Sequence, residues 1–354
     1  MARRAFVLGG RSTPFLGKGN PAFIWKKHPE FGKKENPTLE DYIASSVQGA
    51  LEETQVPASA IERGYLANFA GELFCKQAHL GAALVGANPA FRFMPSTRVE
   101  GACASGGLAF AQAVQSIAVG ADVVLVAGVE VQNTVSAREG GDFLATAAHY
   151  RSQRKLDDFT FPCLFARRMK GYRAEYRDVS EADIASVSVK AYTNANKNPL
   201  AHMHTVKMPL EVASTASDDR NPRFLKNDLY KDFLKVSDCS QVSDGGSALV
   251  LVSEQGLKRL GKKPSDAIEV LTVQQTTDNL YDEVGNLIKL ENSSRCAQLA
   301  YEAAKLKPTD IKVAEVHDCF SIAEVQMMEA LGFAKPGRVS LFVSASRTLH
   351  GRVP

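Results

Sequence analysis

The sequence predicts an α/β protein, because short apolar runs alternate with helical stretches along most of its 354 residues. The run from Val123 to Gly128 is unbroken, as in strands that parallel sheets cover on both faces. The helical stretch before it has apolar residues on one face: Leu108, Ala111, Val114 and Ala118. Successive β-α-β units of this kind indicate a layered α/β fold.

The first part of the chain, residues 1–130, is predicted to be an α/β half. A strand at 5–8 is followed by a polar, basic insertion at 17–36 and a helix from about 37 to 54. Thr38 and Asp41 at the start of that helix have the spacing of a capping box. The elements predicted next are a strand near 65–69 and a helix around 77–85.

Residues 131–240 are richer in charged and aromatic residues and are predicted to form an inserted, mostly helical domain. Their basic residues gather in one stretch: Arg151, Arg154, Lys155, Arg167, Arg168, Lys170 and Arg173. Such a cluster either meets a phosphate-bearing ligand or forms a solvated helix face.

Residues 241–354 return to the β/α alternation and are predicted to be a second α/β half. The predicted strands are 247–252, 267–273 and 313–316, and the predicted helices are 256–260, 293–305 and 321–331. The chain therefore divides into two similar halves with an insertion after the first.

The composition excludes several classes of protein. With 45% hydrophobic residues, 23% charged residues and a net charge of +3, the chain is typical of a soluble globular protein and has no nucleic-acid-binding signature. Six dispersed cysteines predict neither a disulfide framework nor a metal site, which fits a reducing intracellular compartment. No signal peptide is evident, and no apolar run approaches the ~18 residues of a membrane span.

Two cysteines stand where an apolar strand is predicted to give way to a helix. Cys103 lies in Gly-Ala-Cys-Ala-Ser-Gly-Gly, and Cys319 lies in Val-His-Asp-Cys-Phe-Ser. A helix start lowers a thiol pKa and offers N–H groups to an oxyanion, so the pair suggests acyl transfer with a nucleophile and a proton carrier. The structural alternatives are a buried cysteine at 103, a core histidine at 317 and a helix-capping aspartate at 318.

These motifs resemble the thiolase superfamily in order and spacing. The resemblance rests on Cys103-Ala104-Ser105-Gly106, on Ser240 to Gly246, and on His317-Asp318-Cys319-Phe320, with Arg11 to Phe15 similar to the thiolase opening. The His-Asp-Cys-Phe loop is similar to that of the sterol-carrier-protein-type thiolases. The resemblance covers essentially the whole chain.

The resemblance implies a five-layer αβαβα thiolase fold and reversible thiolysis of 3-ketoacyl-CoA in lipid metabolism, such as fatty-acid β-oxidation. Cys103 would be the nucleophile that carries the acyl group, and Cys319 would be the acid/base. His317 would help to bind an oxyanion, and Ser240 would line the pantetheine channel. Acyl-CoA and CoA would be the substrates, with no other cofactor, a loop domain over the CoA, a homodimer, and a mitochondrial or peroxisome-like location.

The chain departs from the family pattern at its end. The segment Thr348–Pro354 resembles the lead-in to the family's Asn-Pro-Ser-Gly-Gly segment, and His350 is not in the Gly-His-Pro context of the family's activating histidine. We therefore expect a truncated thiolase without an identified base for Cys103, with low activity and exposed sheet edges. The alternatives are a ketosynthase-type condensing enzyme, against which Cys319 argues, and an inactive acyl-CoA-binding protein.

Overall fold

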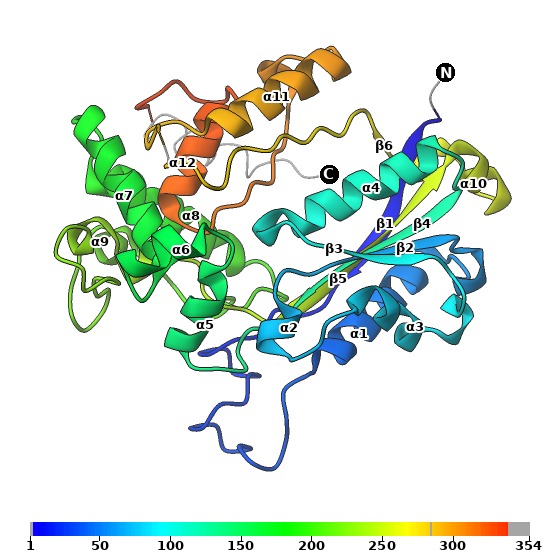
Figure 1. Ribbon diagram of the computed structural model, residues 1–354, viewed down its shortest axis with the longest axis horizontal. Coiled ribbons are helices and arrows are strands. Elements are labelled where there is room, and N and C mark those ends of the chain that lie inside the picture. The colour runs from blue at the N-terminus through cyan, green and yellow to red at the C-terminus, as the bar shows by residue number, and fades with distance from the viewer. Residues whose placement is uncertain (1–2, 284, 339–354) are drawn as a thin grey trace. The chain divides into compact units, whose positions relative to one another are not determined.

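The computed structural model describes residues 3–283 and 285–338, which form two compact units (Figure 1). Unit 1 runs to Ser136 and adds Leu200–His202 and Val242–Gln275, whereas unit 2 contains Ala137–Pro199, Met203–Gln241 and the described residues from Thr276 onward. Each unit has a hydrophobic core of its own. The three-part division at 130 and 240 stays a prediction.

Unit 1 is built on one six-stranded sheet with the order β3-β2-β4-β5-β1-β6. The strands are β1 (Ala5–Ser12), β2 (Arg63–Ala67), β3 (Ser96–Val99), β4 (Val123–Glu130), β5 (Gly245–Ser253) and β6 (Ile268–Val270). β2 is parallel to β3 and β4, whereas β5 is antiparallel to β4 and β1, and β6 is antiparallel to β1. The predicted α/β class is confirmed, and the sheet is mixed because β5 enters between β4 and β1 in the opposite direction.

Helices cover both faces of this sheet, with α1 and α4 on opposite sides (Figure 1). The helices of unit 1 are α1 (Leu39–Thr54), α2 (Gly71–Phe74), α3 (Leu84–Ala87), α4 (Ser105–Ala118) and α10 (Glu254–Arg259). Successive β4 residues alternate between the two cores: Leu125 packs with the α1 side and Val126 with the α4 side. Burying each such side chain contributes about 1.5–3 kcal/mol.

The predicted start of α1 is confirmed, and the predicted face of α4 is partly wrong. Thr38 and Asp41 form the capping box before α1. On α4, Ala109, Ala113 and Ile117 are the residues buried against the sheet, whereas Ala118 is exposed. The alanines at 109 and 113 let the helix lie close to the strands, and the predicted face did not include them.

Unit 2 is helical in the residues that the structure describes. Its helices are α5 (Ala137–Ala145), α6 (Tyr150–Gln153), α7 (Thr160–Glu175), α8 (Glu181–Ala195), α9 (Leu210–Ala213), α11 (Glu291–Ala304) and α12 (Ser321–Ala330). The fully buried side chains of Tyr172, Ile184 and Ile322 join α7, α8 and α12 in one core.

The strand predicted at 313–316 is wrong. These residues lie in an irregular segment, and Val313 is 81% exposed. Between 271 and 338, the described residues contain no strand that pairs with this segment, and an unpaired strand is not stable. The strand predicted at 267–273 is also shorter, because β6 pairs with β1 only from Ile268 to Val270.

Candidate active site

Cys103 lies in a tight turn between β3 and α4, in a short 3₁₀ segment at Ala102–Ala104. The Ser105 hydroxyl accepts the Gly101 N–H at 3.0 Å and donates to the Ala102 carbonyl at 2.7 Å. Ala102 has φ = 49°, a left-handed conformation that costs a non-glycine residue roughly 1–2 kcal/mol. The turn thus presents the exposed Cys103 at the start of a helix, as the motif predicts.

The glycines around Cys103 serve two different purposes. A Cβ at Gly101 would overlap the end of the Leu108 side chain, which would have to shift to make room for it. A Cβ at Gly106 or Gly107 would meet no atom within 4 Å. The glycine positions in the first turn of α4 therefore have open space beside them.

The surroundings of Cys103 raise the pKa of its thiol, mainly by desolvation and further through the negative charge of Glu130. Its own backbone N–H acts in the opposite direction. The expectation of a lowered thiol pKa is therefore wrong, because neighbouring atoms and a carboxylate outweigh the N–H. A thiol in this state needs a proton acceptor before it can attack.

Glu130 is a neighbour of Cys103 that the sequence analysis missed. It ends β4, and its carboxylate accepts the Phe69 N–H and, at 3.3 Å, the Gln132 side-chain amide. Arg98 of β3 donates to the Phe69 carbonyl at 2.6 Å and forms an ion pair with Glu72 at 2.7 Å. The carboxyl ends of β2, β3 and β4 thus form a polar rim. The position of Glu130 at the end of an apolar run is visible in the sequence, but its burial and its partners are not.

Cys319 lies in unit 2, in the loop just before α12. It is half-buried, whereas His317 and Asp318 are exposed, so neither of these two is buried in the core. The next residue, Phe320, is buried and stacks on Phe165 of α7 with ring centroids 4.3 Å apart. The aromatic contact holds the loop at the residue that directly follows Cys319.

Ser240 and Cys319 lie side by side, because the Ser240 N–H donates to the Cys319 carbonyl at 2.9 Å. Cys239 and Phe320 form an isolated antiparallel bridge in the same place. The structure thus brings together Cys319 and Ser240, with His317 two residues away, from segments about eighty residues apart. The roles assigned to Cys103, Cys319, His317 and Ser240 stay predictions.

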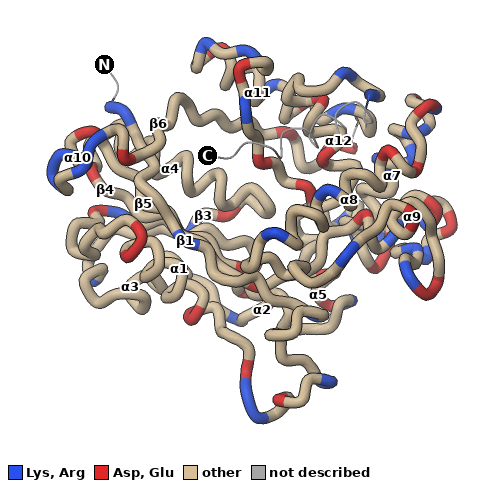
Figure 2. The backbone as a smooth tube through the Cα atoms, turned by 180° about the vertical axis from the view of Figure 1, so that it is seen from behind, with Lys and Arg blue, Asp and Glu red and all other residues tan. Residues whose placement is uncertain are grey.

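Three of the seven residues of the predicted basic cluster in unit 2 pair with acidic groups. Arg154 pairs with Asp142, Arg167 with Glu283 at 3.4 Å, and Arg173 with Glu181. Figure 2 shows basic and acidic positions interleaved around α7, α8 and α9. The positive charge of the cluster is therefore partly neutralised, and the phosphate-site and solvated-face interpretations both stay predictions.

Thr348–Pro354, including His350, lies outside the described residues. Over residues 3–283 and 285–338, no three His, Cys, Asp or Glu side chains are arranged to hold a metal ion. Within the same ranges, no helix combines the length and apolar character needed to cross a bilayer.

Comparison with known proteins links both cysteine motifs to one family. Residues 28–255 match the family model described as the thiolase N-terminal domain, and residues 274–354 match the one described as thiolase C-terminal domain-like. These matches contain the Cys103 and Cys319 motifs, respectively.

Two curated relatives and a solved structure agree with these matches. The acetyl-CoA acetyltransferase of Methanothermobacter thermautotrophicus is 31% identical over 335 residues, which is 94% of this chain and 82% of that protein. Sterol carrier protein 2 of Gallus gallus is 26% identical over 364 residues, which is 99% of this chain and 60% of that protein. The Ltp2-ChsH2(DUF35) aldolase structure has a TM-score of 0.69 at 19% identity, covering 97% of this chain and 80% of that one.

Proposed function

This chain belongs to the thiolase family, and we propose that it is an acyltransferase that cleaves 3-ketoacyl-CoA with CoA through an acyl group on Cys103. The observation that carries the proposal is the Cys103 turn, which exposes a thiol at an uncovered helix start. The cysteine at 319 supplies the second proton-transfer group that the reaction needs.

In the first half-reaction, a base that the sequence motifs leave unidentified takes the thiol proton of Cys103, and the resulting thiolate attacks the 3-keto carbon of the substrate. The bond between C2 and C3 breaks, the shortened acyl group stays on Cys103 as a thioester, and the electron pair moves to the acetyl-CoA enolate. Cys319 gives its proton to C2 of this enolate, and acetyl-CoA leaves.

In the second half-reaction, the Cys319 thiolate takes the thiol proton of an incoming CoA. The CoA thiolate attacks the thioester on Cys103, and the shortened acyl-CoA leaves as Cys103 is released as a thiolate. CoA is thus a substrate, and the reaction needs no further cofactor. The reverse sequence is a Claisen condensation of two acyl-CoA molecules.

The other residues of the loop bind rather than react. We assign His317 to the oxyanion, directly or through a water molecule, because it is exposed two residues before Cys319. Ser240 is exposed and hydrogen-bonded to the Cys319 carbonyl through its backbone, which leaves its hydroxyl to contact the pantetheine arm.

The proposal is tested by intact-protein mass spectrometry after brief incubation with acetoacetyl-CoA. Wild type should gain an acetyl group, and Cys103→Ala should gain none. Cys296→Ala is the matched control, since Cys296 is a half-buried cysteine of α11 without an assigned role and its loss should leave the adduct intact. Turnover of the adduct on addition of CoA identifies thiolysis.

Other outcomes point to the alternatives. A folded protein that binds CoA but acquires no adduct is an acyl-CoA-binding protein. An adduct that is consumed with a decarboxylating acyl donor but not with CoA indicates a ketosynthase. Either result would overturn the proposed thiolysis.

The family also suggests how the enzyme is assembled. We infer a five-layer αβαβα arrangement, a homodimer, and a place in fatty-acid β-oxidation in a mitochondrial or peroxisome-like compartment. Sedimentation velocity of the purified protein tests the dimer, since a single species at the mass of one chain at micromolar concentration contradicts it.

A further inference from the structure

Asp238 is a buried carboxylate beside the Cys319 loop. It is 2% exposed, and both of its oxygens are occupied. One oxygen accepts the Lys235 N–H at 2.9 Å and pairs with the Lys235 ammonium at 2.9 Å. The other accepts the hydroxyl of Ser321, the first residue of α12, at 2.9 Å.

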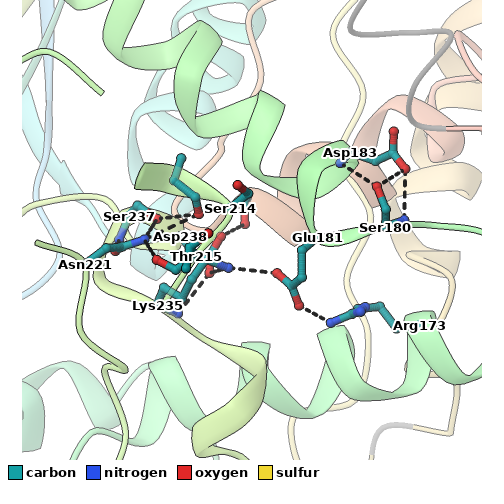
Figure 3. Close-up of polar contacts among 12 residues, drawn as sticks. Arg173, Ser180, Glu181, Asp183, Ser214, Thr215, Asn221, Lys235, Ser237 and Asp238 are labelled. Atoms are coloured by element: carbon teal, nitrogen blue, oxygen red, sulfur yellow. Dashed lines mark hydrogen bonds and ion pairs between the residues drawn. The ribbon is translucent and has the colours of Figure 1, made fainter. Parts of the chain in front are cut away.

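The countercharge of Asp238 is itself buried. Lys235 is 7% exposed, and its ammonium also contacts Glu181 at 2.9 Å. Although burial disfavours the cation, Asp238 and Glu181 together raise the pKa of Lys235. Figure 3 shows Glu181 between Lys235 and Arg173, so the charges form a continuous row from Asp238 to Arg173.

Neighbouring amide contacts hold the segment that carries Asp238. The Asn221 side chain donates to the Ser237 hydroxyl at 3.0 Å and accepts the Ser237 N–H at 3.0 Å (Figure 3). The Asn221 amide also donates to the Val212 carbonyl at 2.9 Å. These hydrogen bonds fix the position of the segment, and therefore the position of the Asp238 carboxylate that it carries.

The fixed segment and the Cys319 loop touch at consecutive residues. The Cys239–Phe320 bridge and the hydrogen bond from Ser240 to Cys319 follow directly after Asp238. These backbone contacts set the path of the loop, and the Ser321 hydroxyl adds a charge-assisted bond at the helix start, where negative charge is favourable.

We propose that Asp238 is a positioning residue for Cys319, holding the first turn of α12 through Ser321 and so fixing where the thiol points. The inference rests on the proposed function, in which Cys319 moves the proton. It adds that the geometry of this proton carrier depends on a buried ion pair from the neighbouring segment. Lys235 pairs with one oxygen of Asp238, and the Ser321 hydroxyl binds the other oxygen at the start of α12.

The test compares Ser321→Ala, which removes the link to Asp238, with Ser321→Thr, which keeps a hydroxyl. Ser186→Ala is the matched control, because the Ser186 hydroxyl bonds only locally to the Asp183 carbonyl on α8. For each variant, the iodoacetamide alkylation rates of Cys319, Cys103 and Cys163 are followed against pH by peptide mass spectrometry.

We expect Ser321→Ala to change the alkylation rate of Cys319 and its pH profile, with Cys103 unaffected. The thiolysis kcat should fall about tenfold, as for the loss of a hydrogen bond to a charged group, with KM nearly constant. Ser321→Thr should restore both readouts, and Ser186→Ala should change neither. Cys163 is fully buried in the same unit, so its protection reports that unit 2 stays folded.

An unchanged Cys319 profile in Ser321→Ala, with Cys163 still protected, overturns the inference. If Cys163 becomes reactive in Ser321→Ala, that variant has lost its fold, and Ser321→Thr is compared with wild type instead. A Cys319 pH profile that differs between these two, although both have a hydroxyl at 321, also overturns the inference. If the Cys319 profile shifts as expected but wild type shows no thiolysis, the proposed function fails and the positioning role stands.

Discussion

Cys103 in unit 1 and Cys319 in unit 2 are held by different kinds of contact. The Cys103 turn is fixed by residues within five positions of it, through the Ser105 hydroxyl and the left-handed Ala102. The start of α12 after Cys319 is fixed by Asp238, 83 positions earlier in the chain. Short-range geometry can be predicted from a motif, whereas a long-range anchor depends on the fold.

The charged groups of the two units also differ: a carboxylate acts on Cys103 in unit 1, whereas the buried carboxylates of unit 2 are paired with lysines. Glu130 acts on Cys103 from the end of β4 and raises its pKa together with desolvation. In unit 2, the buried carboxylates of Asp238 and Glu324 are paired with Lys235 and Lys190, respectively. We expect the pKa of Cys103 to change when the charge of Glu130 is removed. We expect the stability of the unit that carries the Cys319 loop to change when a buried ion pair is broken.

Replacing Cys319 should give the largest effect of the following variants. Cys319→Ala removes the group that protonates the enolate and deprotonates CoA, so thiolysis should slow about 10²–10⁴-fold. Alkylation of Cys103, in the other unit, should keep its rate. Steady-state assays measure the thiolysis rate, and peptide mass spectrometry measures the alkylation of Cys103. Near-normal turnover in Cys319→Ala would mean that another group transfers the proton.

Removing the charge of Asp238 should mainly destabilise unit 2. Asp238→Asn leaves the buried Lys235 without its nearest carboxylate, which should cost about 3–5 kcal/mol of unfolding free energy. Urea denaturation measures the loss. The matched control is Asp228→Asn, which breaks an exposed pair with Lys231 and should change nothing measurable; equal effects of both variants would contradict the importance of burial.

Replacing Glu130 should alter the reactivity of the nucleophile and the pH dependence of stability. Glu130→Gln removes the negative charge, so the pKa of Cys103 should fall and its alkylation at neutral pH should be faster. Desolvation raises the pKa of Glu130 itself above its ordinary value of 4.5. The folded protein therefore binds this proton more tightly than the unfolded chain, and the resulting stability is lost as the pH rises through the folded pKa.

Thermal unfolding of wild type and Glu130→Gln between pH 4 and pH 7 checks the second effect. The melting temperature of wild type should decline relative to that of the variant as the pH rises. A difference that is constant across this range would show that Glu130 does not titrate there.

Filling the open space at α4 should give the smallest effect. Gly106→Ala meets no atom and favours the helix, so it should stabilise unit 1 by about 0.5–1 kcal/mol. If substrate approaches this turn, KM for acyl-CoA should rise at the same time. Gly101→Ala is the contrasting variant, because its methyl group overlaps Leu108 and should destabilise the protein.

The sequence by itself determined the elements whose signals are local. The capping box before α1, the buried run of β4, and the strand-to-helix position of Cys103 all depend on residues within a few positions of one another. The family also followed from short motifs, which preserve their spacing. Periodicity was less reliable on α4, where small residues form the buried face.

The tertiary structure alone decided the direction of β5, the absence of a strand at 313–316 within the described chain, and the charged neighbours of the site. A strand's pairing and direction depend on which other strand lies beside it. Likewise, Glu130 and Asp238 acquire their importance from burial and from partners distant in sequence. Desolvation and paired charges are properties of packing, so no local pattern of residues could predict them.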